Sequence, residues 1–294
     1  MSMQAAKAET SKAETSKAET FRSLHVSGRP LVLFNIWDAG TAKAVASAGA
    51  RALATGSWSV AAANGFADGE RIPLDLAIDN LARIVRANDL PVTVDLESGY
   101  GETAGEVAQS VARAIEAGAV GCNLEDSFPR DGSLRDIGEQ AERIAAARRA
   151  ASDSGVAMFI NARTDVFFQK PAQAHDEAMV RAALDRAKIF AKAGADGLFV
   201  PGVVDETLIG RLVEASPLPV NIMVETNTPS LSRLAELGVA RVSHGPGPYL
   251  AMMKVLGDAA RAALERRLRN RSQEEIGDRR GGVVGGRLTM EPRA

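Results

Sequence analysis

Four stretches of the sequence end a helix-like run with a glycine and continue into a β-prone run within a few residues. These glycines are Gly49, Gly118, Gly194 and Gly238, and each is flanked by alanine, leucine or valine. A glycine at the end of a helix can adopt the left-handed conformation that stops the helix and turns the chain back. The repeated joint indicates that helices and strands alternate, which is typical of a parallel sheet.

Short β-prone runs recur eight times between residues 31 and 243, and helix-like segments rich in Ala, Leu, Glu and Arg fill the gaps. Eight units favour a closed (β/α)₈ TIM barrel over an open doubly wound sheet. No glycine-rich dinucleotide-binding turn follows the first run, which argues against a Rossmann fold. The runs are Leu31–Asn35, Ala52–Thr55, Val92–Leu96, Gly121–Glu125, Ala157–Asn161, Gly197–Val200, Pro219–Met223 and Arg241–Ser243.

The length of 294 residues suits a single barrel, because α/β barrels use about 250 residues as one unit. We expect the catalytic barrel to span residues 21–268. Residues 1–20 repeat a five-residue unit, Lys-Ala-Glu-Thr-Ser, without an apolar stripe, which predicts a disordered low-complexity tail. Residues 269–294, rich in Arg and Gly, are predicted to form a flexible C-terminal tail, whose start could continue a final helix.

Composition narrows the range of partners. The formal net charge of -2 provides no basic face for nucleic acid or for an anionic membrane. No run of eighteen apolar residues occurs, and the N-terminus has no apolar signal core, so we expect a cytoplasmic protein without a membrane span. The only cysteine, Cys122, excludes an intramolecular disulfide and a cysteine-based metal site.

Acidic side chains gather where the third and fourth runs end. Asp95 and Glu97 are two residues apart, so they would face the same side of an extended strand, and Glu125 and Asp126 end the next run. Active residues of a (β/α)₈ barrel lie at these carboxyl ends. A cluster of hard oxygen ligands without His or Cys suits Mg²⁺, or Mn²⁺, better than Zn²⁺. Any one of these acids could instead cap a helix or pair with an arginine.

Other strand ends carry groups that could bind an anion. Arg163, after the fifth run, could clamp a carboxylate with two parallel hydrogen bonds or pair with the acids just named. Asn221, on the seventh run, could bind a substrate oxygen or satisfy the backbone. The small residues of Thr55-Gly-Ser57 would let backbone N–H groups approach an anion, with Trp58 beside them.

These motifs together resemble the isocitrate lyase/phosphoenolpyruvate mutase superfamily. Asp95-Leu-Glu-Ser-Gly-Tyr-Gly101 is similar to its Asp-x-Asp-x-Gly-Tyr-Gly signature, Leu124-Glu-Asp126 to its Glu-Asp, and Ala162-Arg-Thr-Asp165 to its Ala-Arg-Thr-Asp. Asn35 and Asn221 fall in the right order as well. The likeness runs from about residue 21 to residue 260.

The resemblance implies a Mg²⁺-dependent enzyme that makes or breaks a C–C or P–C bond beside a pyruvate-like unit, with the metal stabilising an enolate oxygen. We expect a carbon–carbon lyase, or a decarboxylase-like enzyme, acting on a small 2-oxo or 2-hydroxy carboxylic acid. The family also implies a dimer or tetramer in which a C-terminal helix, here Pro248–Arg269, is exchanged between subunits. The implied metal ligands are Asp95, Glu97 and Glu125; the implied substrate-binding residues are Thr55, Gly56, Ser57, Trp58, Arg163 and Asn221; the implied catalytic residues are Asp68, Arg163 and Glu125.

The sequence departs from the family in the loop after the fourth run, which reads Asp126-Ser-Phe-Pro-Arg-Asp-Gly-Ser-Leu134. The lyases carry a Lys-Lys-Cys-Gly-His-type loop there, whose cysteine is the proposed acid, and Cys122 lies too early to replace it. The mutases place a lysine where Ser127 stands and an asparagine further along. Two alternatives therefore remain open: a P–C phosphonomutase or phosphonopyruvate hydrolase-like enzyme, and a catalytically silent barrel that binds a carboxylate.

A Schiff-base aldolase would need a lysine at a strand end. The lysines of the barrel region fall on predicted helices, except Lys170, which lies in a loop. A glycine-rich phosphate loop after the last run is also a weak candidate, because the prolines of Ser243–Pro248 remove donors. Neither alternative matches the chain as well as a metal-dependent carboxylate enzyme does.

Overall fold

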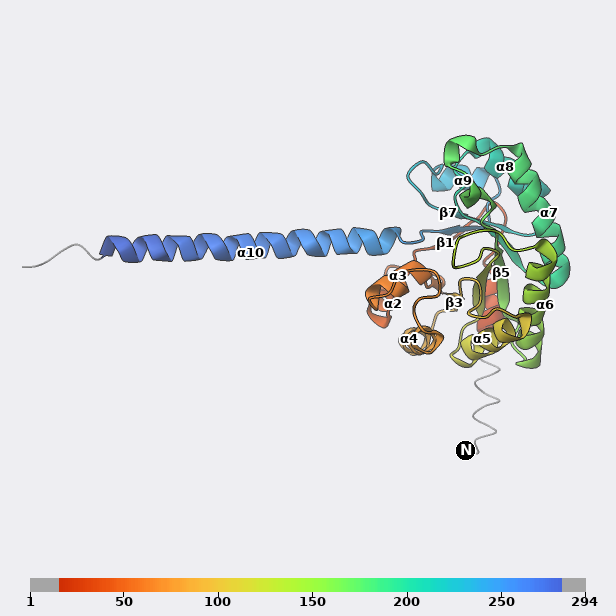
Figure 1. Ribbon diagram of the computed structural model, residues 1–294, viewed down its shortest axis with the longest axis horizontal. Coiled ribbons are helices and arrows are strands. Elements are labelled where there is room, and N and C mark those ends of the chain that lie inside the picture. The colour runs from red at the N-terminus through yellow and green to blue at the C-terminus, as the bar shows by residue number, and fades with distance from the viewer. Residues whose placement is uncertain (1–15, 282–294) are drawn as a thin grey trace, which may run out of the picture. The chain divides into compact units, whose positions relative to one another are not determined.

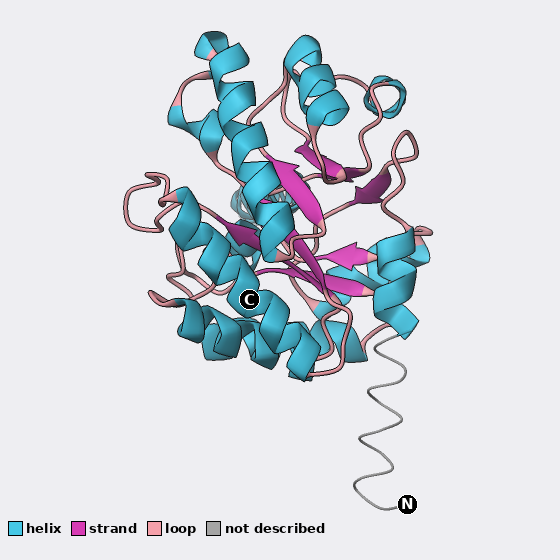
Figure 2. Ribbon diagram, turned by 90° about the vertical axis from the view of Figure 1, so that its right-hand side faces the viewer, coloured by secondary structure: helices cyan, strands magenta, loops and turns pink. Residues whose placement is uncertain are grey.

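The computed structural model describes residues 16–281, with side chains described for residues 16–265. Eight parallel strands form one sheet in the order β1-β8-β7-β6-β5-β4-β3-β2, and helices surround it (Figures 1 and 2). The strands are β1 (Leu31–Leu33), β2 (Leu53–Ala54), β3 (Val92–Asp95), β4 (Gly121–Glu125), β5 (Phe159–Arg163), β6 (Gly197–Val200), β7 (Val220–Met223) and β8 (Arg241–Ser243).

The sheet closes between its two end strands through a single parallel bridge that joins Ile36 to Thr55. Beside it, the Asn35 amide accepts hydrogen bonds from the backbone N–H groups of His244 and Gly245, at 2.9 Å each, and donates one to the carbonyl of Thr55 at 3.0 Å. One buried side chain thus ties together the carboxyl ends of β1, β2 and β8. The predicted (β/α)₈ barrel is confirmed, and its eight predicted strands coincide with the observed ones to within about two residues at either end.

Helices alternate with the strands and cover the outside of the barrel. The four predicted joint glycines all have positive φ, at 94° for Gly49, 93° for Gly118, 104° for Gly194 and 87° for Gly238. Most of the longer helices begin at an Asp or Thr cap, which satisfies free backbone N–H groups of the first turn. The helices are α2 (Ala39–Ser47), α3 (Ser57–Ala63), α4 (Leu74–Arg86), α5 (Ala104–Glu116), α6 (Ile137–Asp153), α7 (Glu177–Ala193), α8 (Glu206–Ala215), α9 (Leu231–Glu236) and α10 (Gly247–Gly281).

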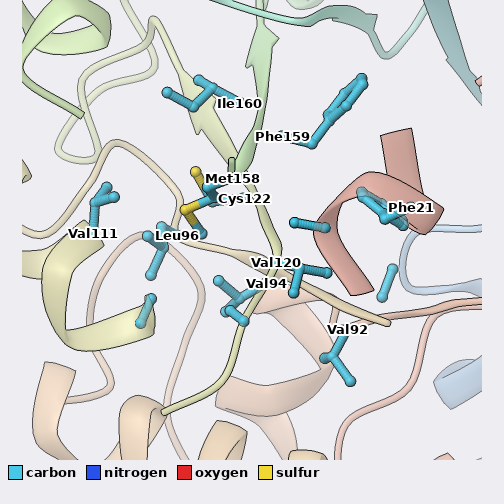
Figure 3. Packing of buried hydrophobic residues seen from close by; sticks show 14 of the residues in the cluster. Phe21, Val92, Val94, Leu96, Val111, Val120, Cys122, Met158, Phe159 and Ile160 are labelled. Carbon is cyan, nitrogen blue, oxygen red and sulfur yellow. The ribbon is translucent and has the colours of Figure 1, made fainter. Parts of the chain in front are cut away.

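A short helix at residues 16–23 closes the floor of the barrel. Ala18 and Phe21 are fully buried, and the Phe21 ring lies edge-on to Phe159 of β5, with 5.7 Å between ring centroids (Figure 3). The prediction that residues 1–20 form a disordered tail is therefore wrong for residues 16–20, while residues 1–15 lie outside the described part. The third copy of the repeat ends in Phe21, which gives this turn the apolar side chain that the earlier copies lack.

The chain divides into two compact units, with the boundary after Tyr249. The barrel is the first unit, and the second consists, in the described residues, of α10 from Leu250 to Gly281. The helix runs past residue 268, so the predicted boundary between barrel and tail falls inside α10, and residues 282–294 lie outside the described part. No helix among residues 16–281 is both long enough and apolar enough to cross a membrane.

Candidate active site

A pocket of about 190 Å³ opens among the carboxyl ends of the strands, where barrel enzymes place their chemistry. It receives at least one residue from each of the eight strands or from the loop that directly follows it. Its volume suits a molecule of a few carbon atoms rather than a nucleotide or a large cofactor. The lining residues are Asn35, Gly56, Ser57, Trp58, Asp68, Asp95, Asn123, Arg163, Phe168, Phe199, Met223, Ser243, Gly245 and Pro246.

Asp95, the last residue of β3, presents its carboxylate to this pocket. The backbone N–H of Ser57 donates to Asp95 Oδ2 at 3.2 Å, and the Asn123 amide lies 3.4 Å from Oδ1. The backbone N–H of Asp95 in turn donates to the Thr55 hydroxyl at 3.0 Å. Neighbouring strands on both sides therefore fix the carboxylate, and its remaining lone pairs are left for a ligand.

Asp68 reaches the same pocket from the loop between α3 and α4. Partial loss of hydration raises the pKa of its carboxyl group, and the negative charge of Asp95 raises it further, while Arg163 opposes the shift. An acid with a raised pKa keeps its proton closer to neutral pH, which suits a group that gives or takes a proton. Asp68 and Asp95 are thus two carboxyl groups on one pocket with different environments.

Glu97 and Glu125 lie beside the pocket but do not line it. The expectation that Asp95 and Glu97 share a face assumed an extended strand. However, β3 ends at Asp95, and Glu97 has a φ of 50°, so its side chain turns toward the loop that carries Glu70. Burial raises the pKa of Glu97 to about 7, and Asp68 and Asp95 add to the shift.

Arg163, at the end of β5, supplies the only positive side chain among the described pocket-lining residues. Its Nη1 lies 2.7 Å from Glu125 Oε2, and its Nε and Nη2 donate to the two oxygens of Asp165 at 2.7 and 3.1 Å. Burial favours the neutral form, but Glu125 and Asp165 outweigh it and raise the pKa of Arg163. A guanidinium group has five N–H donors, so two remain, one on each terminal nitrogen.

The ion pair with Arg163 also indicates the role of Glu125 in the site. Burial raises the pKa of Glu125, while contact with Arg163 stabilises the ionised form. The Ser127 hydroxyl donates to Asp165 at 2.7 Å and lies 3.3 Å from Glu125. Asp126 also orients Asp165, because its side chain accepts a hydrogen bond from the backbone N–H of Asp165 at 2.9 Å. The acids after β4 and β5 therefore surround the guanidinium group and hold it in place.

The remaining predicted substrate-binding residues divide into two groups. Gly56, Ser57 and Trp58 line the pocket, as expected from the small residues after β2. Thr55 and Asn221 are buried and do not line it. The amide nitrogen and the amide oxygen of Asn221 each lie 3.2 Å from the hydroxyl of Ser243. In this structure Asn221 therefore supports a residue that lines the pocket and does not line the pocket itself.

One side of the pocket is apolar, which the sequence motifs did not reveal. Phe168, Phe199 and Met223 form this wall together with Pro246. The Arg163 guanidinium carbon lies 5.7 and 5.9 Å from the ring centroids of Phe168 and Phe199, within cation–π range. Phe199 and Met223 are ordinary apolar residues of β6 and β7 in the sequence, and only their position near the strand ends distinguishes them.

A larger hollow of about 740 Å³ lies on the flank of the barrel, beside α5 and α6. It is lined by charged residues of both signs, among them Glu106, Arg113, Arg130 and Glu139. It also lacks Asp95 and Arg163. We place the active site in the smaller pocket, because convergent groups of opposite charge at strand ends are the mark of a site for a small ligand.

The pocket suits a hydrated magnesium ion. Its acidic side chains, Asp95 and Asp68, offer hard oxygen atoms, and the described lining residues include no cysteine, lysine or ligating imidazole. No three His, Cys, Asp or Glu side chains among residues 16–265 are arranged to hold one ion directly. The donors therefore match an ion that is bound through one or two carboxylates and keeps most of its waters, as Mg²⁺ does.

Comparison with known proteins agrees with this geometry. A crystal structure from Burkholderia cenocepacia J2315, provisionally assigned as a phosphonomutase, is 60% identical, with a TM-score of 0.83, over 85% of this chain and 99% of that one. An uncharacterised protein of Mycobacterium tuberculosis H37Rv is 34% identical over 82% of this chain and 88% of its own length. An oxaloacetate decarboxylase of Pseudomonas entomophila is 31% identical over 86% of each chain.

The sequence model of the phosphoenolpyruvate phosphomutase family matches residues 21–264, which is nearly the whole barrel and the start of α10. The match includes the strand ends that carry Asp95, Glu125 and Arg163. On this match and on the curated relatives, the chain belongs to the phosphoenolpyruvate phosphomutase family, within the phosphoenolpyruvate mutase/isocitrate lyase superfamily.

Proposed function

We propose that the protein is a Mg²⁺-dependent carbon–carbon lyase that cleaves a small 2-oxo or 2-hydroxy carboxylic acid, with decarboxylation of an oxaloacetate-like acid as the leading reaction. The observation that carries the proposal is the pairing of Asp95 and Arg163 across one small pocket, with Asp68 on its wall. The oxaloacetate decarboxylase relative, 31% identical over 86% of both chains, supports the same class of reaction.

Asp95 would hold the metal, together with waters and the oxygen atoms of the substrate. When bound there, Mg²⁺ supplies a Lewis acid that stabilises negative charge on the oxygen of the 2-oxo group. Glu125 would act on the substrate only through Arg163, because that guanidinium group already occupies one of its oxygens. We therefore assign Glu125 the role of orienting Arg163.

Arg163 would bind the carboxylate next to the 2-oxo group through its two remaining N–H donors. In an oxaloacetate-like acid bound in this way, the bond between carbons 3 and 4 is the bond that breaks. Carbon dioxide leaves, and the electron pair of the broken bond passes to the 2-oxo oxygen as an enolate. Asp68 in its protonated form would then donate a proton to carbon 3 and recover one from solvent, a role to which its raised pKa is suited.

The apolar wall limits what lies on the far side of the substrate. Phe199 and Met223 give that side neither charge nor strong hydrogen bonds. Burying a charged group there would carry a large desolvation cost, so we expect small acids with a neutral or departing group at carbon 3 to be preferred over tricarboxylic acids.

The test combines calorimetric titration of Mg²⁺ and oxalate with an assay for pyruvate released from oxaloacetate, corrected for the rate without enzyme. We expect oxalate to bind only with Mg²⁺, and EDTA to abolish pyruvate release. Asp95→Ala should lose both, whereas Asp75→Ala should change neither, because Asp75 is an exposed acid on α4. Full turnover by Asp95→Ala would reject the metal assignment. Mg²⁺-dependent oxalate binding without turnover of any 2-oxo acid would favour a silent binding barrel.

A P–C bond-cleaving activity is the second candidate, favoured by the 60% identity to the provisionally assigned phosphonomutase. Phosphonopyruvate would present the same 2-oxo acid to Asp95 and Arg163, with phosphorus in place of the departing carboxylate. However, Ser127 and its loop provide no lysine or asparagine for a phosphonate. If the enzyme releases phosphate from phosphonopyruvate faster than it releases pyruvate from oxaloacetate, this second candidate is the correct one.

We also propose that the chain assembles with a second copy of itself through α10. This helix exposes Leu250, Met253 and Leu256. On the barrel, Val32 and Phe34 are exposed on the outer side of β1, beside a cleft of about 660 Å³ that also includes Val45 of α2. Exposed apolar side chains that lie together commonly mark an interface. Helix exchange between two copies would cover both faces.

A further inference from the structure

Three non-glycine residues among those described have a left-handed backbone, and all three meet at one place beside the pocket. Their φ angles are 57° for Glu70, 50° for Glu97 and 52° for Tyr100. This conformation is unfavourable for a residue with a side chain and persists only where the surrounding contacts impose it. Such residues cluster at functional sites, so their convergence calls for a physical cause.

The cause is a set of reciprocal hydrogen bonds between two loops. The backbone N–H of Glu70 donates to Glu97 Oε2 at 2.6 Å. In return, Glu70 Oε1 accepts the Ser98 hydroxyl at 2.7 Å and the backbone N–H of Tyr100 at 2.8 Å. The Tyr100 hydroxyl completes the set by donating to Glu97 Oε1 at 3.0 Å. Each glutamate thus binds the other one's loop.

The loop after β3 is a fixed base for this set. Arg143 of α6 is 2% exposed, and its guanidinium group donates to the carbonyls of Ser98, Gly101 and Glu102 at 2.6, 2.8 and 3.0 Å. A Cβ on Gly101 would lie 2.4 Å from Glu106 Cβ, so this part of the loop packs closely against the start of α5. The base is therefore held by α5 and α6 rather than by the pocket.

The loop that carries Asp68 has fewer attachments of its own. Asp68 lies two residues before Glu70, and Gly69 between them has a φ of 87°. A Cβ on Gly69 would lie 3.2 Å from the carbonyl oxygen of Pro129, so the loop also touches the segment after β4. Asp68 also has a side-chain hydrogen bond with Ser57, and Ile72 of the same loop is buried. Glu70 adds the attachment to the base, so we expect the position of Asp68 to depend on it.

We infer that Glu70, Glu97 and Tyr100 form a clasp that positions Asp68, and that Glu97 is a positioning residue rather than a metal ligand. Both Glu97 oxygens accept hydrogen bonds within the clasp, and Glu97 does not line the pocket. The catalytic part of this inference rests on the proposed function of Asp68. The clasp itself rests only on the contacts between the two loops.

The experiment compares Glu70→Ala with Glu70→Gln in the full-length protein. Both hydrogen bonds that the Glu70 side chain accepts fall on Oε1, so a glutamine amide oxygen can accept them, whereas alanine cannot. Hydrogen exchange measured by mass spectrometry should become roughly tenfold faster or more across residues 66–72 in Glu70→Ala. In Glu70→Gln it should stay within about twofold of the parent.

Tyr100→Phe provides an independent variant that removes only the hydroxyl donated to Glu97. It should also speed exchange across residues 66–72, while peptides from β4 to β6 stay unchanged in every variant, which confirms that the barrel is folded. Unchanged exchange in both Glu70→Ala and Tyr100→Phe would overturn the clasp. Equal acceleration in Glu70→Gln and Glu70→Ala would overturn the assignment of the Oε1 hydrogen bonds.

A second measurement separates positioning from metal binding. In Glu70→Ala, kcat for oxaloacetate should fall at least about tenfold, while the Kd of Mg²⁺-dependent oxalate binding stays within about twofold. An unchanged kcat, or an equal loss of metal binding, would overturn the positioning role. If the parent protein turns over no 2-oxo acid, the proposed function fails, yet the exchange measurements still decide whether the clasp exists.

Discussion

At the scale of single residues, Arg163 binds two carboxylates of the protein and, in the proposed function, a third from the substrate. Glu125 and Asp165 take three of its N–H donors, and the substrate would take the other two. We predict that Arg163→Lys, which keeps the charge but loses the planar fork, raises KM for oxaloacetate at least about tenfold. Steady-state kinetics over a wide substrate range would measure this effect. An unchanged KM would show that the substrate carboxylate binds elsewhere.

A control must separate binding from stability, because Arg163 also neutralises buried acids. Removing one partner of a buried ion pair destabilises a protein by about 3–5 kcal/mol, so Arg163→Ala should unfold more readily than Arg163→Lys. Thermal unfolding of both variants would show this order. The reverse order would mean that Glu125 and Asp165 do not depend on the guanidinium charge.

The sequence predicted which charged residues lie at the pocket better than it predicted their roles. Asp95 and Arg163 could be placed because they end strands, and a strand end fixes where a side chain points. The position of Glu97 could not be predicted, because the direction of its side chain depends on a left-handed backbone conformation that no local sequence pattern indicates. The apolar wall of the pocket was not predicted either, because in the sequence Phe199 looks like any other apolar residue of a strand.

At the scale of elements, the helix-to-strand joints differ in how tightly they pack. A Cβ on Gly118 would lie 2.7 Å from Val85 Cγ1, whereas a Cβ on Gly49 would meet nothing within 4 Å. Both residues have positive φ, so alanine at either position costs about 1–2 kcal/mol of backbone strain. Gly118→Ala should lose about 1–3 kcal/mol more through overpacking. Urea unfolding would measure the difference, and equal losses would refute it.

The helix at residues 16–23 leads to His25, a half-buried histidine whose surroundings disfavour its charged form. The His25 ring stacks on Phe159 with 3.9 Å between centroids, and its Nδ1 lies 2.9 Å from the carbonyl oxygen of Phe21. Burial lowers the pKa of His25 to about 3, and the cations Arg241 and Arg22 add to the shift. The folded protein therefore holds His25 neutral where the unfolded chain would bind a proton.

The sign of the effect follows from proton counts. Between the unfolded pKa of about 6.5 and the folded pKa, the unfolded state binds more protons, so stability is complete above pH 6.5 and falls as the pH drops. His25 should remove about 2 kcal/mol of unfolding free energy between pH 8 and pH 5. His25→Gln should lose this part of the pH dependence. Urea titrations of both proteins at the two pH values would measure it, and parallel curves would contradict it.

Element boundaries could be predicted wherever the pattern was local. The glycine joints and the β-prone runs located the eight strands because each signal is contained within a few residues. The first helix was missed because only one copy of the repeat ends in an aromatic residue. Phe21 becomes a core residue through contact with Phe159, which is 138 residues later in the chain and invisible to a local pattern.

At the scale of the whole molecule, the assembly proposed above depends on α10. If a second copy covers its apolar face, Leu256→Glu should shift the protein toward the monomer, because Leu256 is 61% exposed in the single chain and would be buried in the assembly. Light scattering over a range of protein concentrations would report the mass. A matched change of the exposed Arg261 to Glu should leave the mass unchanged, since it alters charge without removing apolar surface.

The floor of the barrel is made from the first and the later parts of the chain. Arg22 pairs with Asp196 at 2.6 Å, the Ser27 hydroxyl donates to the carbonyl of Gly238 at 2.9 Å, and Leu31 pairs with Arg241 in the sheet. During synthesis, Arg22 and Leu31 must therefore wait for Asp196 and Arg241, which are made much later, before they find these partners. Phe21 likewise finds its partner Phe159 only 138 residues later, so an incomplete chain exposes apolar surface that the folded protein buries, which makes it prone to aggregation.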